Sequence, residues 1–193
     1  MWVIALPVMA SLNLILDVWL GKDMVPEYTS LFIYIILFTG LFDALGSSIS
    51  VPIYATGNIK GYQIITSSVK FMVLPISYIL YRIGFGPAAS MYISLLLAGI
   101  EQTSRVIIWG RLVKESPLIY LNKIIFPALA IIILSSLTMY FIVEYTTKFI
   151  TIISFGINTI VALLIAILMI YFIGLNRMEK NQILNIIRKN ISK

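Results

Sequence analysis

Four charged side chains interrupt long apolar stretches of the chain: Asp43, Lys70, Glu101 and Arg105. Each costs at least about 2.5–3.5 kcal/mol at the centre of a membrane-spanning helix unless it is paired or hydrated. Counted inward from the expected helix ends, Asp43, Lys70 and Glu101 lie roughly 12–16 Å deep, and Arg105 lies about 8 Å deep. Two acids and two bases at similar depth can bind a charged ligand, or they can neutralise one another.

This charge cluster has two interpretations. In the first it is an internal network of ion pairs that holds helices together, since Glu101 and Arg105 are four residues apart and share a helix face. For Arg105 we favour a structural interpretation, which includes extension of its side chain toward the headgroups. For Asp43 and Lys70 we favour a functional one, because an intramembrane charge usually faces a cavity or a pathway. Asp17 lies near the expected outer interface, and we assign it no role.

The composition predicts that these charges lie in a membrane. The chain has 193 residues, of which 60% are hydrophobic and 11% charged, whereas soluble domains average about 25% charged residues. So few charges could not cover a water-soluble globule. The absence of cysteine and histidine excludes disulfides, thiol chemistry and the usual zinc sites. No Walker A, GxSxG or HExxH motif is present, and we expect no enzyme activity, no metal and no other cofactor.

Six stretches are long and apolar enough to span a bilayer, which takes roughly 20 residues. They are residues 2–20, 31–54, 63–82, 88–109, 124–143 and 149–174. Uninterrupted apolar runs favour helices over barrel strands, so the predicted fold is an all-α integral membrane protein. Pro52 and Pro75 are expected to interrupt the second and third spans. The small residues of "LGSSIS" and "TSS" in those two spans predict close helix approach, and the longest predicted connection is "GRLVKESPLIYLNK".

The basic residues predict the orientation. Nine lysines and arginines follow the second, fourth and sixth spans, and three lie on the other side. Both termini are therefore expected in the cytoplasm, in a multi-pass protein of a bacterial inner membrane. Beyond a transmembrane lobe of residues 1–176, the tail 177–193 repeats isoleucine at helical spacing among basic residues, which favours an interfacial helix on the anionic inner leaflet over a solvated tail. Since the first span starts almost at Met1, we expect the chain to be a fragment of something longer.

Several short motifs give the chain a resemblance to a known family. They are "WLG" followed by "VPEYT" after the first span, "ATGNIKGYQ" after the second, "LPISYIL" in the third, and "GFGPAASMY" before and into the fourth. Together they resemble the C-terminal half of bacterial polysaccharide flippases, the Wzx-like O-antigen and capsule branch of the MOP superfamily. The resemblance covers about residues 5–115; the last two spans and the tail fit mainly by pattern.

The resemblance implies a flippase of 12 or 14 helices in two lobes around a central cavity, related to MATE/MOP-type transporters. It implies that undecaprenyl-diphosphate-linked oligosaccharide moves from the inner to the outer leaflet by alternating access, for surface polysaccharide or lipopolysaccharide synthesis. This chain resembles the second lobe, so transport would require the missing N-terminal lobe or a partner chain. The other expected partner is the lipid bilayer, and we expect no binding of nucleic acid.

The resemblance assigns no role to the residues of the charge cluster. We infer their roles from their depth in the membrane and from the free-energy cost of placing a charge there. We assign substrate binding to Lys70 and Arg105, the cations deep enough to contact an anionic head, and a counter-ion or H⁺/Na⁺ coupling role to Asp43 and Glu101. Three alternatives stay open: another MOP-type transporter for a peptidoglycan precursor or a drug, a membrane enzyme, and a truncated remnant that transports nothing.

Overall fold

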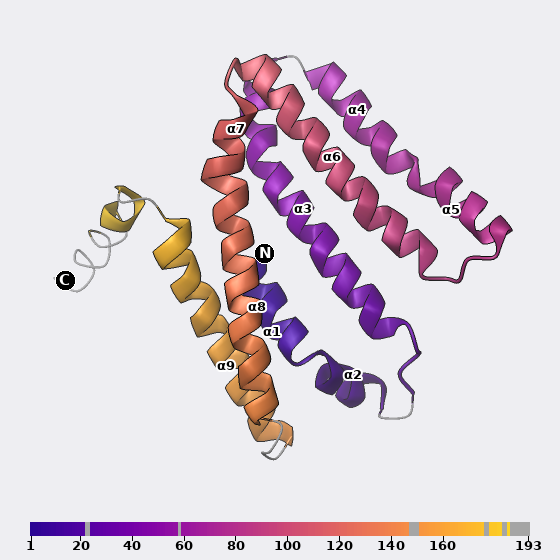
Figure 1. Cartoon of the computed structure of the whole chain (residues 1–193), viewed down its shortest axis with the longest axis vertical. Coiled ribbons are helices and arrows are strands. Elements are labelled where there is room, and N and C mark those ends of the chain that lie inside the picture. Colours follow the sequence, from indigo (N-terminus) through magenta and orange to yellow (C-terminus); the bar gives the residue numbers. More distant parts are fainter. Residues whose placement is uncertain (22–23, 58, 147–150, 176–177, 183–184, 186–193) are drawn as a thin grey trace. The chain divides into compact units, whose positions relative to one another are not determined.

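The computed structural model describes residues 1–21, 24–57, 59–146, 151–175, 178–182 and 185. In these ranges the chain is helical and has no strand, which confirms the all-α prediction. The helices in Figure 1 are α1 (Trp2–Ala10), α2 (Leu12–Leu20), α3 (Thr29–Ala55), α4 (Ile59–Phe71), α5 (Val73–Ile83), α6 (Ala89–Val113), α7 (Pro117–Tyr120), α8 (Phe126–Thr146) and α9 (Thr151–Met169). π-helical turns precede α8 at Leu121–Ile125 and follow α9 at Ile170–Gly174.

Five helical segments within the described ranges are long and apolar enough to cross a membrane. They are Thr29–Ala55, Ile59–Ile83, Ala89–Val113, Pro117–Thr146 and Ile153–Gly174. Each coincides with one of the expected spans, and helices satisfy their own backbone hydrogen bonds in hydrocarbon. By length and composition the chain is therefore a helical, multi-pass membrane protein.

The first expected span, residues 2–20, is not one continuous helix. It consists of α1 and α2, which are bent by 70° at the break between them, so it counts as a sixth span only if the bent pair crosses together. The break lies at Ser11, whose amide still donates to the Pro7 carbonyl at 3.2 Å. Neither glycine nor proline occupies position 11, which explains why apolar composition alone predicted an unbroken helix.

The predicted long connection between the fourth and fifth spans is mostly helix. Only Lys114–Ser116 separates α6 from α7, and α7 continues through the π-helical turn into α8. Lys114 ends α6 in the left-handed conformation, with φ 58°. Pro117 starts the next helix, where its missing N–H would have no partner in any case. Of the 14 residues of this stretch, only Lys114–Ser116 lie outside a helix, so the expectation of a loop of this length was wrong.

The two prolines expected to interrupt spans have different effects. α3 continues through Pro52 to Ala55. The break between α4 and α5 lies at Met72, three residues before Pro75. A proline cannot donate to the carbonyl four residues before it, and its ring crowds that carbonyl, which here belongs to Phe71. The interruption predicted from Pro75 is thus confirmed, whereas the one predicted from Pro52 was wrong.

The first of two compact units consists of Met1 and Ile15–Tyr120. Its centre is α6, which packs against α3 on one side and against α4 and α5 on the other (Figure 1). Buried apolar side chains of these helices include Leu41, Ile49, Ile53, Leu97 and Val106. This unit contains all four residues of the charge cluster.

The second unit consists of Trp2–Leu14 and Leu121–Lys193, and in it α1 packs against α8 and α9. The buried Trp2 indole Nε1 donates to the Ser135 hydroxyl of α8 at 2.8 Å. Thr146 Oγ1 donates to Asn158 Oδ1 at 2.8 Å and joins α8 to α9. Buried hydrogen bonds of this kind select one helix register, because an unpaired polar group in an apolar environment is costly.

The predicted interfacial helix of the tail lies largely outside the described residues, as do all four of its isoleucines. Among the described tail residues, Lys180 donates from Nζ to the Phe172 carbonyl at 3.1 Å and lies over the Tyr171 ring. The cytoplasmic location of both termini stays a prediction, and so does the division at residue 176.

Candidate functional site

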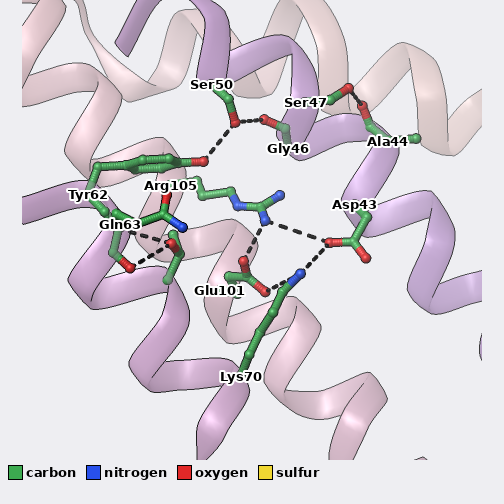
Figure 2. A network of polar contacts seen from close by, with 11 residues as sticks. Asp43, Ala44, Gly46, Ser47, Ser50, Tyr62, Gln63, Lys70, Glu101 and Arg105 are labelled. Atoms are coloured by element: carbon green, nitrogen blue, oxygen red, sulfur yellow. Dashed lines mark hydrogen bonds and ion pairs between the residues drawn. The ribbon is translucent and has the colours of Figure 1, made fainter. Parts of the chain in front are cut away.

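The four residues of the charge cluster, predicted only to share a depth, meet in one network of ion pairs (Figure 2). Lys70 Nζ lies 3.3 Å from Asp43 Oδ1 and 3.7 Å from Glu101 Oε2. Arg105 Nη2 lies 3.6 Å from the same Asp43 oxygen and donates a hydrogen bond to Glu101 Oε1. Each base therefore contacts both acids, and the formal charges cancel.

Three helices supply these residues at one level. Asp43 lies twelve positions before the end of α3, Lys70 eleven after the start of α4, and Glu101 twelve before the end of α6. At 1.5 Å per residue, all three lie about 16–18 Å from the end of the unit where α3 is connected to α4. Arg105 lies closer to that end but follows Glu101 by one helical turn, so its side chain can reach back to the same level.

The cluster divides into a covered pair and an exposed pair. The Glu101 and Arg105 side chains are 3% and 11% exposed, whereas those of Asp43 and Lys70 are 48% and 56% exposed. The Glu101–Arg105 pair is therefore shielded between α3 and α6, and the Asp43–Lys70 pair lies at the surface of the first unit. A ligand can contact the exposed pair without moving a helix.

Arg105 lies in the ion-pair network, which is one of the two forms of the structural interpretation that we favoured for it. Its guanidinium turns toward the N-terminal part of α6 to meet Glu101, and it contacts Asp43 of α3. It does not extend toward the nearer helix end, so extension to the headgroups was wrong. The ion pair of Glu101 and Arg105, predicted from their spacing, is confirmed.

A glycine of α3 makes room for the covered pair. A Cβ atom on Gly46 would lie 1.6 Å from Arg105 Nη1 and 2.9 Å from Gln102 Oε1. The guanidinium thus lies directly against the α3 backbone, at a distance that no other residue type permits without rearrangement. The close approach predicted from "LGSSIS" occurs here, and Gly46 is the residue of that motif that permits it.

Polar side chains around Gly46 were not predicted as part of the site. Ser50 Oγ donates to the Gly46 carbonyl at 3.0 Å and is hydrogen-bonded to Tyr62 Oη of α4 at 2.7 Å (Figure 2). On the other side, Gln102 Nε2 donates to Tyr120 Oη at 3.3 Å, and Tyr120 donates to the Leu45 carbonyl at 3.0 Å. Gln102 in the fourth expected span, and tyrosines in the connections next to the spans, were the available signal for these contacts.

Two buried polar atoms beside the cluster have no hydrogen-bond partner among the described residues, Gln102 Oε1 and Arg105 Nε. Most buried polar side-chain atoms in proteins are hydrogen-bonded. These two atoms on the covered side of the cluster can therefore still form a hydrogen bond. Asp43 and Lys70 can also bind further groups, because their side chains are exposed.

The remaining predicted features lie apart from this site. Asp17 of α2 is half-buried and takes part in none of the cluster's ion pairs. Within the described ranges, no group of three or more acidic side chains is arranged to hold a metal ion. The site's available chemistry is electrostatic: a surface ammonium can bind an anion, and a surface carboxylate can bind a cation or a proton.

Comparisons of the chain with protein-family models, with curated proteins and with solved structures give no match. Function is therefore inferred from the residues, their contacts and the motifs described above.

Proposed function

We propose that the chain is one lobe of a flippase that moves undecaprenyl-diphosphate-linked oligosaccharide from the inner to the outer leaflet of a bacterial membrane. The observation that carries the proposal is the exposed Asp43–Lys70 pair at the level of a membrane interior. Exposed charge at that depth is costly, and it usually marks a hydrated pathway. The motifs of the first four spans favour this substrate class.

The substrate's chemistry accounts for the arrangement of the exposed pair. A diphosphate-linked sugar head is polar and anionic, so it needs a cation as it leaves the aqueous phase, while its lipid tail stays in hydrocarbon. Lys70 offers a mobile ammonium, which binds phosphate as a point charge. When no substrate is present, Asp43 neutralises that ammonium at 3.3 Å. The substrate phosphate would replace the Asp43 carboxylate as the partner of Lys70. The carboxylate would return to Lys70 when the substrate leaves, so that binding stays reversible.

The covered pair has a different role in this proposal. The Arg105 side chain is nearly buried and contacts both acids. We therefore assign it the role of positioning Asp43 and Glu101, and not that of contacting the substrate. Glu101, at 3.7 Å from Lys70, is placed to take up the ammonium when Asp43 binds a proton or a sodium ion. In such an exchange, the coupling ion changes which acid neutralises Lys70.

The resemblance to a C-terminal lobe implies a second lobe that completes the cavity. We propose that this lobe comes from a preceding part of the same protein or from a partner chain. Since Asp43 and Lys70 lie at the surface of the first unit, they are available to such a lobe and to the substrate together.

Competition for binding separates the candidate substrates. Purified chain in detergent would be incubated with radiolabelled undecaprenyl-diphosphate-linked oligosaccharide. We expect unlabelled oligosaccharide carrier to displace it, the peptidoglycan precursor to displace it weakly because only the diphosphate and lipid are shared, and the cationic drug tetraphenylphosphonium to have no effect. Equal displacement by the peptidoglycan precursor would favour that substrate, and displacement by the drug would contradict an anion-binding site.

A further inference from the structure

A groove at one end of the first unit is separate from the charge cluster. It is an open depression of about 190 Å³ between the start of α4 and the end of α6. Gly61, Tyr62 and Ile65 line it from α4, and Ile108, Arg111 and Leu112 line it from α6. Gly61 lies nine positions before Lys70 on α4, about 14 Å along the helix, so the groove and the cluster are different sites.

The lining of the groove is amphipathic. Ile65, Ile108 and Leu112 make its walls apolar, and Arg111 lies in the last turn of α6. The Arg111 side chain is exposed and forms no ion pair within the part of the chain that the structure describes. The groove therefore combines one cation without an ion-pair partner, Arg111, with apolar side chains.

We propose that this groove binds an anionic phospholipid, with the headgroup phosphate at Arg111 and an acyl chain along the apolar walls. Both helices end or begin here, and in a membrane-spanning unit helix ends lie at headgroup level. Basic pockets between spanning helices recognise anionic headgroups, with each nearby lysine or arginine contributing about 1 kcal/mol, or about fivefold in affinity. The inference rests on the membrane location of the chain and is independent of the proposed transport.

The groove also offers a way to block it without disturbing the fold. A Cβ on Gly61 would meet no atom within 4 Å, so a larger side chain there enters open space. Gly99 of α6 is equally open and does not line the groove. Because Gly61 lines the groove, Gly61→Leu is the variant designed to obstruct it, and Gly99→Leu is its matched control. For the charge, Arg111→Gln is matched by Arg82→Gln, an exposed arginine at the other end of the unit.

The test is native mass spectrometry of the full chain in detergent with added phosphatidylglycerol or phosphatidylcholine of identical acyl chains. We expect about fivefold higher occupancy of phosphatidylglycerol, a loss of that preference in Arg111→Gln, and its retention in Arg82→Gln. Gly61→Leu should lower the occupancy of both lipids, whereas Gly99→Leu should not. Inorganic phosphate at millimolar concentration should compete weakly, since it lacks the acyl chains.

Three results would overturn the proposal: equal occupancy of the two lipids, the same loss of preference in both arginine variants, or complete displacement by inorganic phosphate, which would indicate a simple anion site. Circular dichroism of each variant would show whether it keeps its helix content. If Arg111→Gln unfolded, the comparison of Gly61→Leu with Gly99→Leu would still test the proposal. Equal lipid occupancy in these two variants would show that the groove binds no lipid.

Discussion

Glu101→Leu is expected to lower the free energy of unfolding by about 3 kcal/mol, because it leaves the covered Arg105 without its closest partner. Breaking a buried ion pair by removing one member typically costs about 3–5 kcal/mol. We expect the lower end of this range, since Asp43 remains 3.6 Å from the guanidinium. The measurement is denaturant unfolding in detergent micelles, monitored by circular dichroism.

Two further variants separate the charge effect from a general effect of the substitution. Glu101→Leu combined with Arg105→Met removes both members of the covered pair and leaves Asp43 with Lys70, so it should recover more than half of the loss, since apolar replacement of a whole buried pair is often neutral. Glu115→Leu, at an exposed acid outside any described ion pair, should change stability by less than about 0.5 kcal/mol. If the double variant were as unstable as Glu101→Leu alone, the loss of stability would not come from an unpaired Arg105 charge.

Gly46→Ala is the second substitution with a large expected effect. Its Cβ would meet Arg105 Nη1 at 1.6 Å, so the guanidinium has to move and lose contact with Glu101, Asp43 or both. Overpacking of a tight site costs about 1–3 kcal/mol. We expect a loss of this size in the same unfolding measurement.

The matched control for Gly46→Ala is Gly99→Ala on α6. A Cβ at Gly99 meets no atom within 4 Å, so this variant should gain about 0.5–1 kcal/mol from the higher helix propensity of alanine. Opposite signs for the two variants would support close packing of Arg105 against α3. An equal gain in both would show that the Arg105 guanidinium is not closely packed against α3 at Gly46.

The helical fold could be predicted because a spanning helix leaves a simple signal, an apolar run of sufficient length. The positions of Asp43, Lys70 and Glu101 along those runs were enough to predict a common depth. Their contacts could not be predicted in the same way, because depth does not fix the rotation of a helix about its axis. The rotation depends on packing at residues such as Gly46, and sequence shows only that such packing is permitted there.

The errors have related physical causes. The stretch between the fourth and fifth spans was interpreted as a loop because of its polar residues, yet only Lys114–Ser116 lie outside a helix and Pro117 starts the next one. For Arg105, extension to the headgroups was an alternative to the ion pair with Glu101, because its position along α6 allows both. In the folded unit, Asp43 of α3 and Glu101 both contact the guanidinium. The bend at Ser11 left no sequence signal, since no proline or glycine marks it.

The most direct test of the proposed function is glycan export by Lys70→Ala. The gene for this chain would be deleted in its own bacterium, so that any partner lobe is still produced, and wild-type chain, Lys70→Ala or Lys60→Ala would be re-expressed. Lys60→Ala is the matched control, because Lys60 is an exposed lysine of the same helix that lies outside the cluster. Outer-leaflet oligosaccharide would be measured on spheroplasts with a membrane-impermeant glycan label.

We expect the deletion to abolish labelling, wild-type chain and Lys60→Ala to restore it, and Lys70→Ala to remain without export while it accumulates normally in the membrane. Normal labelling with Lys70→Ala, or no loss of labelling on deletion, would contradict a role for the chain in moving lipid-linked oligosaccharide.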